Sequence, residues 1–183
     1  ERTRTRIASN LTSFARRDPG AEAAALKRAA VAITLVESCG GVAFVLTRRA
    51  SRLRAHGGQW ALPGGRFDDG EDCVRAALRE LDEEVGLRLA PPDVLGVLDD
   101  YPTRSGYLIT PVVVWAGADA RLVPNPEEVA SVHRISLGQI VDADAVSFVA
   151  IEQSPRQVVR IRIEGNLIHA PTAALLYQFR EVL

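Results

Sequence analysis

Three glutamates near the middle of the chain have a spacing that could bind a metal ion. Glu80, Glu83 and Glu84 stand at i, i+3 and i+4, so a helix would place them on one face about a turn apart. Carboxylates with neither cysteine nor histidine among them favour magnesium, manganese or calcium over zinc. The spacing therefore predicts a divalent-cation site on a solvent-facing side of the helix. A solvated charged face is the alternative interpretation.

The residues around these glutamates extend the pattern. Gly65 is followed after five residues by Glu71, and seven residues later the chain reads Arg79-Glu80-Leu81-Asp82-Glu83-Glu84-Val85-Gly86-Leu87. This arrangement resembles the Nudix box at every fixed position, and the chain is identified as a member of the Nudix hydrolase superfamily. The resemblance implies an α+β fold, a Nudix-type α/β/α sandwich with a mixed β-sheet. It also implies Mg²⁺- or Mn²⁺-dependent hydrolysis of a nucleoside diphosphate linked to another group.

The resemblance further implies roles for individual residues. It places metal ligands at Glu80, Glu83 and Glu84 and at the backbone carbonyl of Gly64. Arg79 falls on the motif arginine, whose expected role is to orient the neighbouring glutamate.

The reaction also needs a general base. Clustered phosphate charge repels hydroxide, so bound metal ions must neutralise it and activate a water, and a carboxylate must accept the proton of that water. One candidate is Glu80. The other is Glu127 or Glu128, next to Pro124-Asn125-Pro126, for which a solvated loop acid is the alternative. We take Glu80, Arg79 and Glu128 as the candidate catalytic residues.

An arginine-rich segment precedes the box. Leu46-Thr47-Arg48-Arg49-Ala50, then Arg54, Gly58 and Leu62-Pro63-Gly64-Gly65, resembles the motif of coenzyme A pyrophosphatases within the superfamily. Arginine forks bind phosphate oxygens in pairs, which suits a ligand with several phosphates. Arg49 and Arg54 fall on motif positions and are the expected substrate contacts.

Three functions remain open from these residues. The first is hydrolysis of the diphosphate of coenzyme A or its derivatives to 3′,5′-ADP and 4′-phosphopantetheine. The second is the same reaction on ADP-ribose, a nucleotide sugar, a dinucleotide or an oxidised nucleoside triphosphate. The third is a non-catalytic nucleotide sensor, which is disfavoured because every box carboxylate is present.

The elements that must position these residues follow from hydrophobic periodicity and turn residues. We predict a helical N-terminal extension over residues 1–28 and a Nudix domain over 29–183. Within the domain we expect strands at 30–36, 42–47, 94–101, 107–115, 132–135, 158–163 and 167–169, helices at 71–85, 137–142 and 171–183, and a long loop over 48–65.

Composition and charge exclude several classes of protein. The 183 residues are 47% apolar and 25% charged, which is typical of a globular domain, and the two cysteines allow no disulfide scaffold. A net charge of −1 argues against a nucleic-acid partner, and no apolar run predicts a membrane span, so we expect a cytoplasmic protein with a small nucleotide substrate. Homodimers are common among proteins with this motif, so a homodimer is also an expectation.

Charge is unevenly distributed along the sequence. Residues 47–66 hold five arginines and no acid, whereas residues 67–84 hold eight acids and two arginines. The near-neutral total is therefore the sum of a segment suited to phosphates and a segment suited to metal ions.

Overall fold

The computed structural model describes residues 2–51, 57–152 and 154–183. Its helices are α1 (Arg2–Ser13), α2 (Cys73–Val85), α3 (Gly138–Val141) and α4 (Thr172–Arg180). Its strands are β1 (Lys27–Ser38), β2 (Gly41–Arg49), β3 (Trp60–Ala61), β4 (Gly64–Arg66), β5 (Val94–Val97), β6 (Tyr101–Pro102), β7 (Tyr107–Gly117), β8 (Val129–Ser136), β9 (Val146–Ile151), β10 (Ser154–Ile163) and β11 (Asn166–Ile168).

The larger sheet is mixed and has β1 at its centre. Its main path runs β3-β2-β1-β7-β5, with β4 added to β1, β6 to β7 and β8 to β2. The β1–β7 pair is parallel, and the other pairs are antiparallel. Strands β9, β10 and β11 form a separate antiparallel sheet. The predicted mixed α+β class is confirmed.

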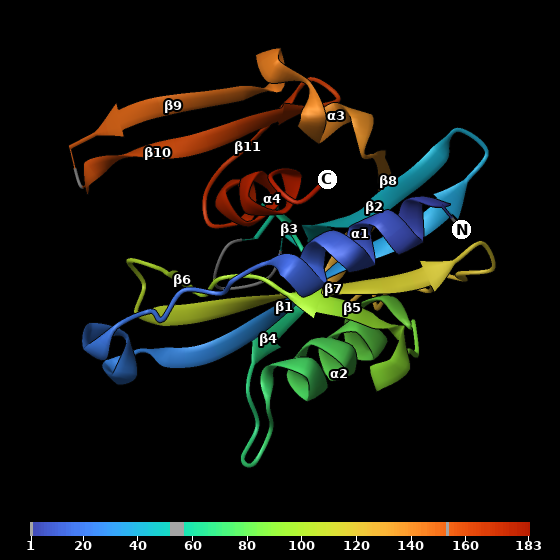
Figure 1. The fold of residues 1–183 in the computed structure, drawn as a ribbon, viewed down its shortest axis with the longest axis horizontal. Coiled ribbons are helices and arrows are strands. Elements are labelled where there is room, and N and C mark those ends of the chain that lie inside the picture. The colour runs from blue at the N-terminus through green and yellow to red at the C-terminus, as the bar shows by residue number, and fades with distance from the viewer. Residues whose placement is uncertain (1, 52–56, 153) are drawn as a thin grey trace.

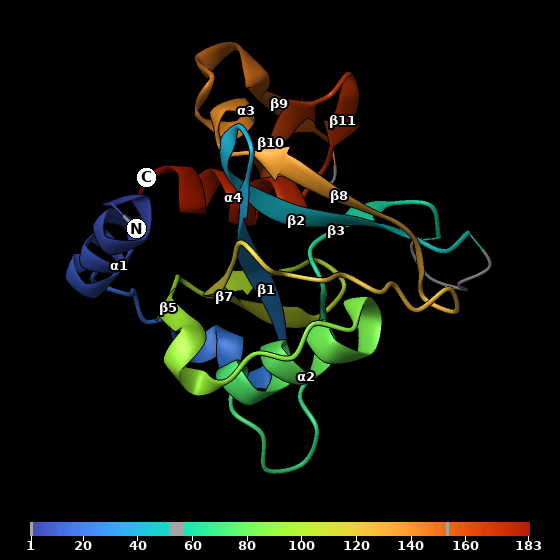
Figure 2. The same ribbon diagram turned by 90° about the vertical axis from the view of Figure 1, so that its right-hand side faces the viewer.

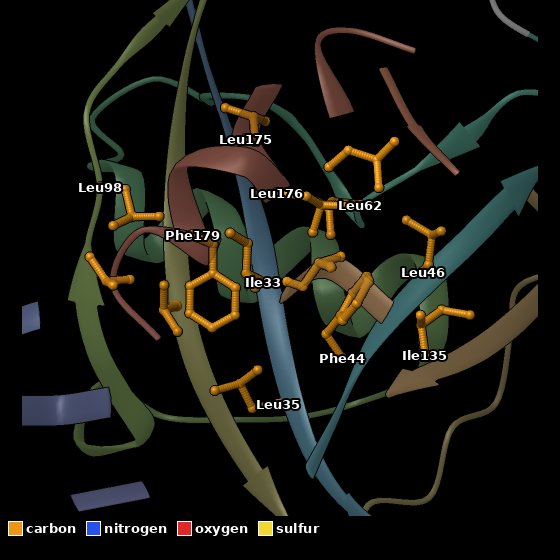
Figure 3. Close-up of a cluster of buried hydrophobic side chains, with 14 of the residues drawn as sticks. Ile33, Leu35, Phe44, Leu46, Leu62, Leu98, Ile135, Leu175, Leu176 and Phe179 are labelled. Atoms are coloured by element: carbon orange, nitrogen blue, oxygen red, sulfur yellow. The ribbon is translucent and has the colours of Figure 1, made fainter. Parts of the chain in front are cut away.

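Helices cover both faces of the large sheet, as Figures 1 and 2 show. Alternate residues of β1 point to opposite faces, as a strand requires. On one face Ala30 and Ala32 pack with Ala77 and Leu81 of α2. On the other, Ile33 and Leu35 of β1, Phe44 and Leu46 of β2, and Leu176 and Phe179 of α4 form the larger core, as the close-up in Figure 3 shows.

The N-terminal helix belongs to this second core. Ile7 of α1 is fully buried and Leu11 is nearly so, and both pack in the cluster that includes α4. Asn10 Nδ2 donates a hydrogen bond to the carbonyl of Val182 at 2.9 Å, which joins the two ends of the described chain. No helix in the described residues is long and apolar enough to cross a membrane.

Several predicted element boundaries were wrong. The loop over 48–65 contains β3 and most of β4, which have two and three residues and are too short to give a periodic signal. The strand predicted over 94–101 is interrupted after Val97, and β1 begins at Lys27 rather than after a helix reaching residue 28. Strand β9 was not predicted at all, because its Val146–Ile151 segment is an exposed edge with no alternating burial.

Candidate active site

Helix α2 is held at both ends by local hydrogen bonds. Asp72 caps its start by accepting a hydrogen bond from the backbone N–H of Arg75 at 2.8 Å. Gly86 ends it in the left-handed conformation, with φ at 65°, and its N–H donates to the Asp82 carbonyl at 2.8 Å. A side-chain cap of this kind contributes about 1 kcal/mol to helix stability. The box helix therefore has a defined length and a defined face against the sheet.

Glu84 lies on the packed face of α2. It is only 2% exposed, and its main-chain carbonyl accepts a hydrogen bond from the Asn125 N–H at 2.8 Å. Desolvation by burial raises the pKa of its carboxyl to about 8, although the Arg49 guanidinium, with Nη1 at 3.6 Å from Oε1, acts in the opposite direction. The prediction that all three glutamates face solvent was therefore wrong for Glu84, because β2 and the loop at 123–128 pack over this part of the helix.

Glu80 occupies a space that a glycine leaves open. A Cβ added to Gly65, the first residue of the box, would overlap the Glu80 carboxylate, so a side chain there would displace that carboxylate. Burial raises the pKa of the Glu80 carboxyl, and a hydrogen bond from Arg79 opposes that rise. Glu83, by contrast, has a side chain that is 53% exposed.

Arg79 connects the carboxylates of the box. Its Nε and Nη2 donate to the two oxygens of Glu71 at 2.9 and 3.0 Å, and this pairing lowers the pKa of Glu71. Its Nη1 donates to Glu80 at 2.9 Å and to Glu83 at 3.1 Å. The remaining Nη2 proton reaches the backbone carbonyl of Arg66 at 2.9 Å. One guanidinium thus holds both ends of the box in a fixed relation.

The carboxylates fit a hard divalent cation by their chemistry and burial. In this conformation no three acidic, histidine or cysteine side chains of the described residues converge on one point, since Arg79 and Arg49 lie against the glutamates. Burial is the main cause of the raised pKa of Glu84, and the charges of Glu80 and Glu128 add to it, so these acids lie near one another. Carboxylate oxygens that lie near one another are the kind of ligand that Mg²⁺ and Mn²⁺ prefer.

The loop that contains the second candidate base packs against the same carboxylates. The Ala50 N–H donates to the Glu128 carbonyl at 2.8 Å, which places the loop beside the end of β2. Glu128 is half-buried and raises the pKa of both Glu80 and Glu84 through its charge. Glu127 is exposed. The structure thus brings Glu128 close to the box glutamates.

A pocket of about 350 Å³ adjoins this cluster. Arg49, Gly64 and Gly65 contribute to its lining, and the other lining residues come mainly from β1, β3, β7 and α4. Arg54, the other expected phosphate contact, lies outside the described residues. Gly64 has no room for a side chain, because a Cβ there would collide with the backbone of β1.

Nothing in the sequence indicated that two of the pocket residues lie against each other. Arg66 and Tyr107 both line the pocket, and the Arg66 guanidinium carbon lies 5.1 Å from the centre of the Tyr107 ring. The two residues are separated by 40 intervening residues. Their contact could be recognised only once β4 and β7 were seen to pair with β1. Trp115, by contrast, is 8% exposed and belongs to the core.

Comparisons with known proteins agree with this geometry. The family model described as NUDIX domain matches residues 26–155. A protein from Photorhabdus laumondii named "Uncharacterized Nudix hydrolase NudL" is 33% identical over 140 residues, which cover 75% of each chain. A protein of the same name from Yersinia pestis is 44% identical over 94 residues, which cover 51% of this chain and only 47% of that protein.

A solved structure shares the fold over most of the chain. The crystal structure of the Nudix hydrolase RenU from M. smegmatis aligns with a TM-score of 0.58 and 26% identity, covering 85% of this chain and 84% of that one. A match over this share of the chain extends well beyond the box. On the family model, the relatives and the fold, the chain belongs to the Nudix hydrolase family.

Proposed function

We propose that this Nudix hydrolase cleaves the diphosphate bond of coenzyme A or its derivatives, giving 3′,5′-ADP and 4′-phosphopantetheine. The observation that carries the proposal is the position of Arg49, which contacts the buried Glu84 at 3.6 Å and also lines the adjoining pocket. The pocket walls include Trp60, Leu62 and Leu175. An arginine at the junction of acidic cluster and apolar pocket suits a diphosphate that carries a long, uncharged chain.

The proposed roles of the residues follow from their contacts. Glu80, Glu83, Glu84 and the Gly64 carbonyl would hold Mg²⁺ or Mn²⁺, and such an ion supplies positive charge to the phosphate oxygens and acidity to a water. Arg79 keeps the Glu80 carboxylate in place through its 2.9 Å hydrogen bond.

The remaining roles concern the proton and the substrate phosphates. Glu80 or Glu128 accepts the proton of the attacking water; burial raises the pKa of Glu80, which makes it a stronger base than an exposed carboxylate. Arg49 and Arg54 bind the phosphates and neutralise the charge that develops on the leaving group. A cytoplasmic location and a homodimer remain predictions.

The test is a mass-spectrometric screen of nucleoside diphosphate derivatives with Mg²⁺ or Mn²⁺. Coenzyme A should give 3′,5′-ADP and 4′-phosphopantetheine, and EDTA should abolish both products. Faster cleavage of ADP-ribose, a nucleotide sugar, a dinucleotide or an oxidised nucleoside triphosphate would reject coenzyme A as the substrate. The proposed diphosphate hydrolysis would then still hold. Binding of nucleotides without turnover would favour the sensor.

Arginine variants test the substrate more sharply. Arg49→Ala and Arg54→Ala should each raise the KM for coenzyme A more than the KM for ADP-ribose, because coenzyme A carries an additional ribose phosphate. Arg48→Ala is the matched control, since the exposed Arg48 donates from Nε to the Gly58 carbonyl at 3.2 Å and occupies a variable motif position. Equal effects on the two substrates would count against coenzyme A.

A further inference from the structure

The wall of the pocket carries a second arginine whose charge is not used by the box. Among the described residues that line the pocket are Arg49 and Arg66, and none of these lining residues is acidic. Arg49 directs its guanidinium at the buried Glu84. Arg66 is exposed, and within the described residues it forms no ion pair with a carboxylate; its guanidinium instead stacks on the Tyr107 ring.

The sheet register explains why Arg66 faces the pocket. In β4, Gly65 lies opposite Ala30 of β1 on the face that packs against α2, and Arg66 lies opposite Ala29 on the other face. Tyr107 lies opposite Lys27, two residues from Ala29 and therefore on the same face of β1. The stacking of Arg66 on Tyr107 thus follows from backbone pairing through the central strand.

The backbone of Arg66 is also tied to the acidic cluster. Its carbonyl accepts the 2.9 Å hydrogen bond from Arg79 Nη2, the same guanidinium that holds Glu80. The side chain of Arg66 therefore starts from a point fixed relative to the carboxylates. A guanidinium stacked on an aromatic ring keeps its edge N–H groups free to donate, and stacking restricts its rotation.

We propose that Arg66 binds a phosphate of the nucleotide substrate as a second cationic contact beside Arg49, and that Tyr107 positions its guanidinium. This inference rests on the proposed function only in requiring a phosphate-bearing ligand in the pocket. Charge-assisted hydrogen bonds of this kind correspond to roughly tenfold to hundredfold changes in affinity. Tyr107 acts through Arg66 and needs its ring but not its hydroxyl.

The experiment measures calorimetric binding of ADP and of adenosine in the presence of Mg²⁺. Arg66→Ala should weaken ADP binding at least tenfold and leave adenosine binding unchanged, because adenosine carries no phosphate. The ADP affinity of Arg66→Lys should fall between those of the wild type and Arg66→Ala, since lysine keeps the positive charge and loses the planar guanidinium. Arg88→Ala is the matched control: Arg88 has a side chain that is 87% exposed, pairs with Asp82 at 2.9 Å and lies outside the pocket lining.

Variants of Tyr107 separate positioning from simple folding. Tyr107→Phe should bind ADP like the wild type, whereas Tyr107→Leu should lose part of the affinity that Arg66→Ala loses, with no change in adenosine binding. A Tyr107→Phe loss equal to that of Arg66→Ala would contradict the stacking role.

Three results would overturn the inference about Arg66. They are unchanged ADP binding in Arg66→Ala, an equal loss for ADP and adenosine, and a wild type that binds ADP no better than adenosine. Because the readout is binding, it is independent of the proposed reaction: selective loss of ADP binding without any diphosphate hydrolysis by the wild type would reject the proposed function and keep Arg66 as a phosphate contact.

Discussion

Replacing Glu84 with glutamine should remove a pH-dependent destabilisation of the metal-free protein. Glu84 is 2% exposed, and burial raises the pKa of its carboxyl to about 8 from an ordinary value of 4.5. The folded state therefore keeps a proton that the unfolded state loses as the pH rises through 4.5. Below that pH the carboxyl imposes no charge-related cost, and the cost then grows until the pH passes the folded pKa.

The magnitude follows from the two pKa values. Each pH unit between them costs about 1.4 kcal/mol. The interval from pKa 4.5 to pH 7 thus corresponds to about 3 kcal/mol, and the full interval to pKa 8 corresponds to about 5 kcal/mol. Glutamine does not titrate, so Glu84→Gln removes this pH-dependent cost. Burying its amide adds a cost of its own, but that cost does not vary with pH.

The assay is urea unfolding in EDTA at pH 5, 7 and 9, for the wild type and for the variant. The difference in free energy of unfolding should shift in favour of Glu84→Gln by about 2 to 3 kcal/mol between pH 5 and 7, and then level off above pH 8. Glu83→Gln is the matched control for changing a glutamate on the same helix, since the Glu83 side chain is 53% exposed.

Mg²⁺ provides a second comparison. Binding to the folded state should raise the stability of the wild type and leave Glu84→Gln much less affected, because the variant lacks a proposed ligand. A stability difference that is flat with pH, or one that increasingly favours the wild type as the pH rises, would refute the reasoning about the buried carboxyl.

Other consequences of the geometry are open to direct measurement. Glu83→Gln should lower kcat at least about a hundredfold with a change in Tm of no more than a degree or so, because its exposed side chain contributes little to the fold; wild-type-like kcat would remove Glu83 from the metal site. Gly65→Ala should reduce kcat and Mg²⁺ affinity together, since its methyl group would displace the Glu80 carboxylate; unchanged Mg²⁺ titrations would show that Glu80 does not need that space. Arg79→Lys should lower kcat at least about tenfold, since lysine cannot hold Glu71 and Glu80 together as the guanidinium does; steady-state kinetics equal to the wild type would argue against positioning.

Parts of the fold and site were predictable because their causes are local. The start and end of α2 depend on Asp72 and Gly86, which act within one turn of the chain. The proximity of Glu80 and Glu83, which lets Arg79 reach both, follows from the helical repeat alone. Strands β1 and β2 were visible as apolar, β-branched runs around a glycine turn.

Other parts depend on segments that are far apart in the sequence. In the sequence, Glu84 is one of several acids on a helix. No residue within one turn of it indicates that Arg49 and Asn125 pack over it. The stacking of Arg66 on Tyr107 needs the register of two strands against β1. Strand β9 has no fully buried residue and no regular alternation of burial, so hydrophobic periodicity does not mark it.

Motif spacing and helical periodicity are properties of neighbouring residues, so they were enough to predict the family, the chemistry of the donor groups and the helix that presents them. The buried glutamate, the acid of the later loop that approaches it and the arginines that face the pocket became known only from the folded chain. The physical reason is that desolvation and charge coupling depend on what lies within a few ångströms in space, and in this protein those neighbours come from β2, β4, β7 and the loop at 123–128.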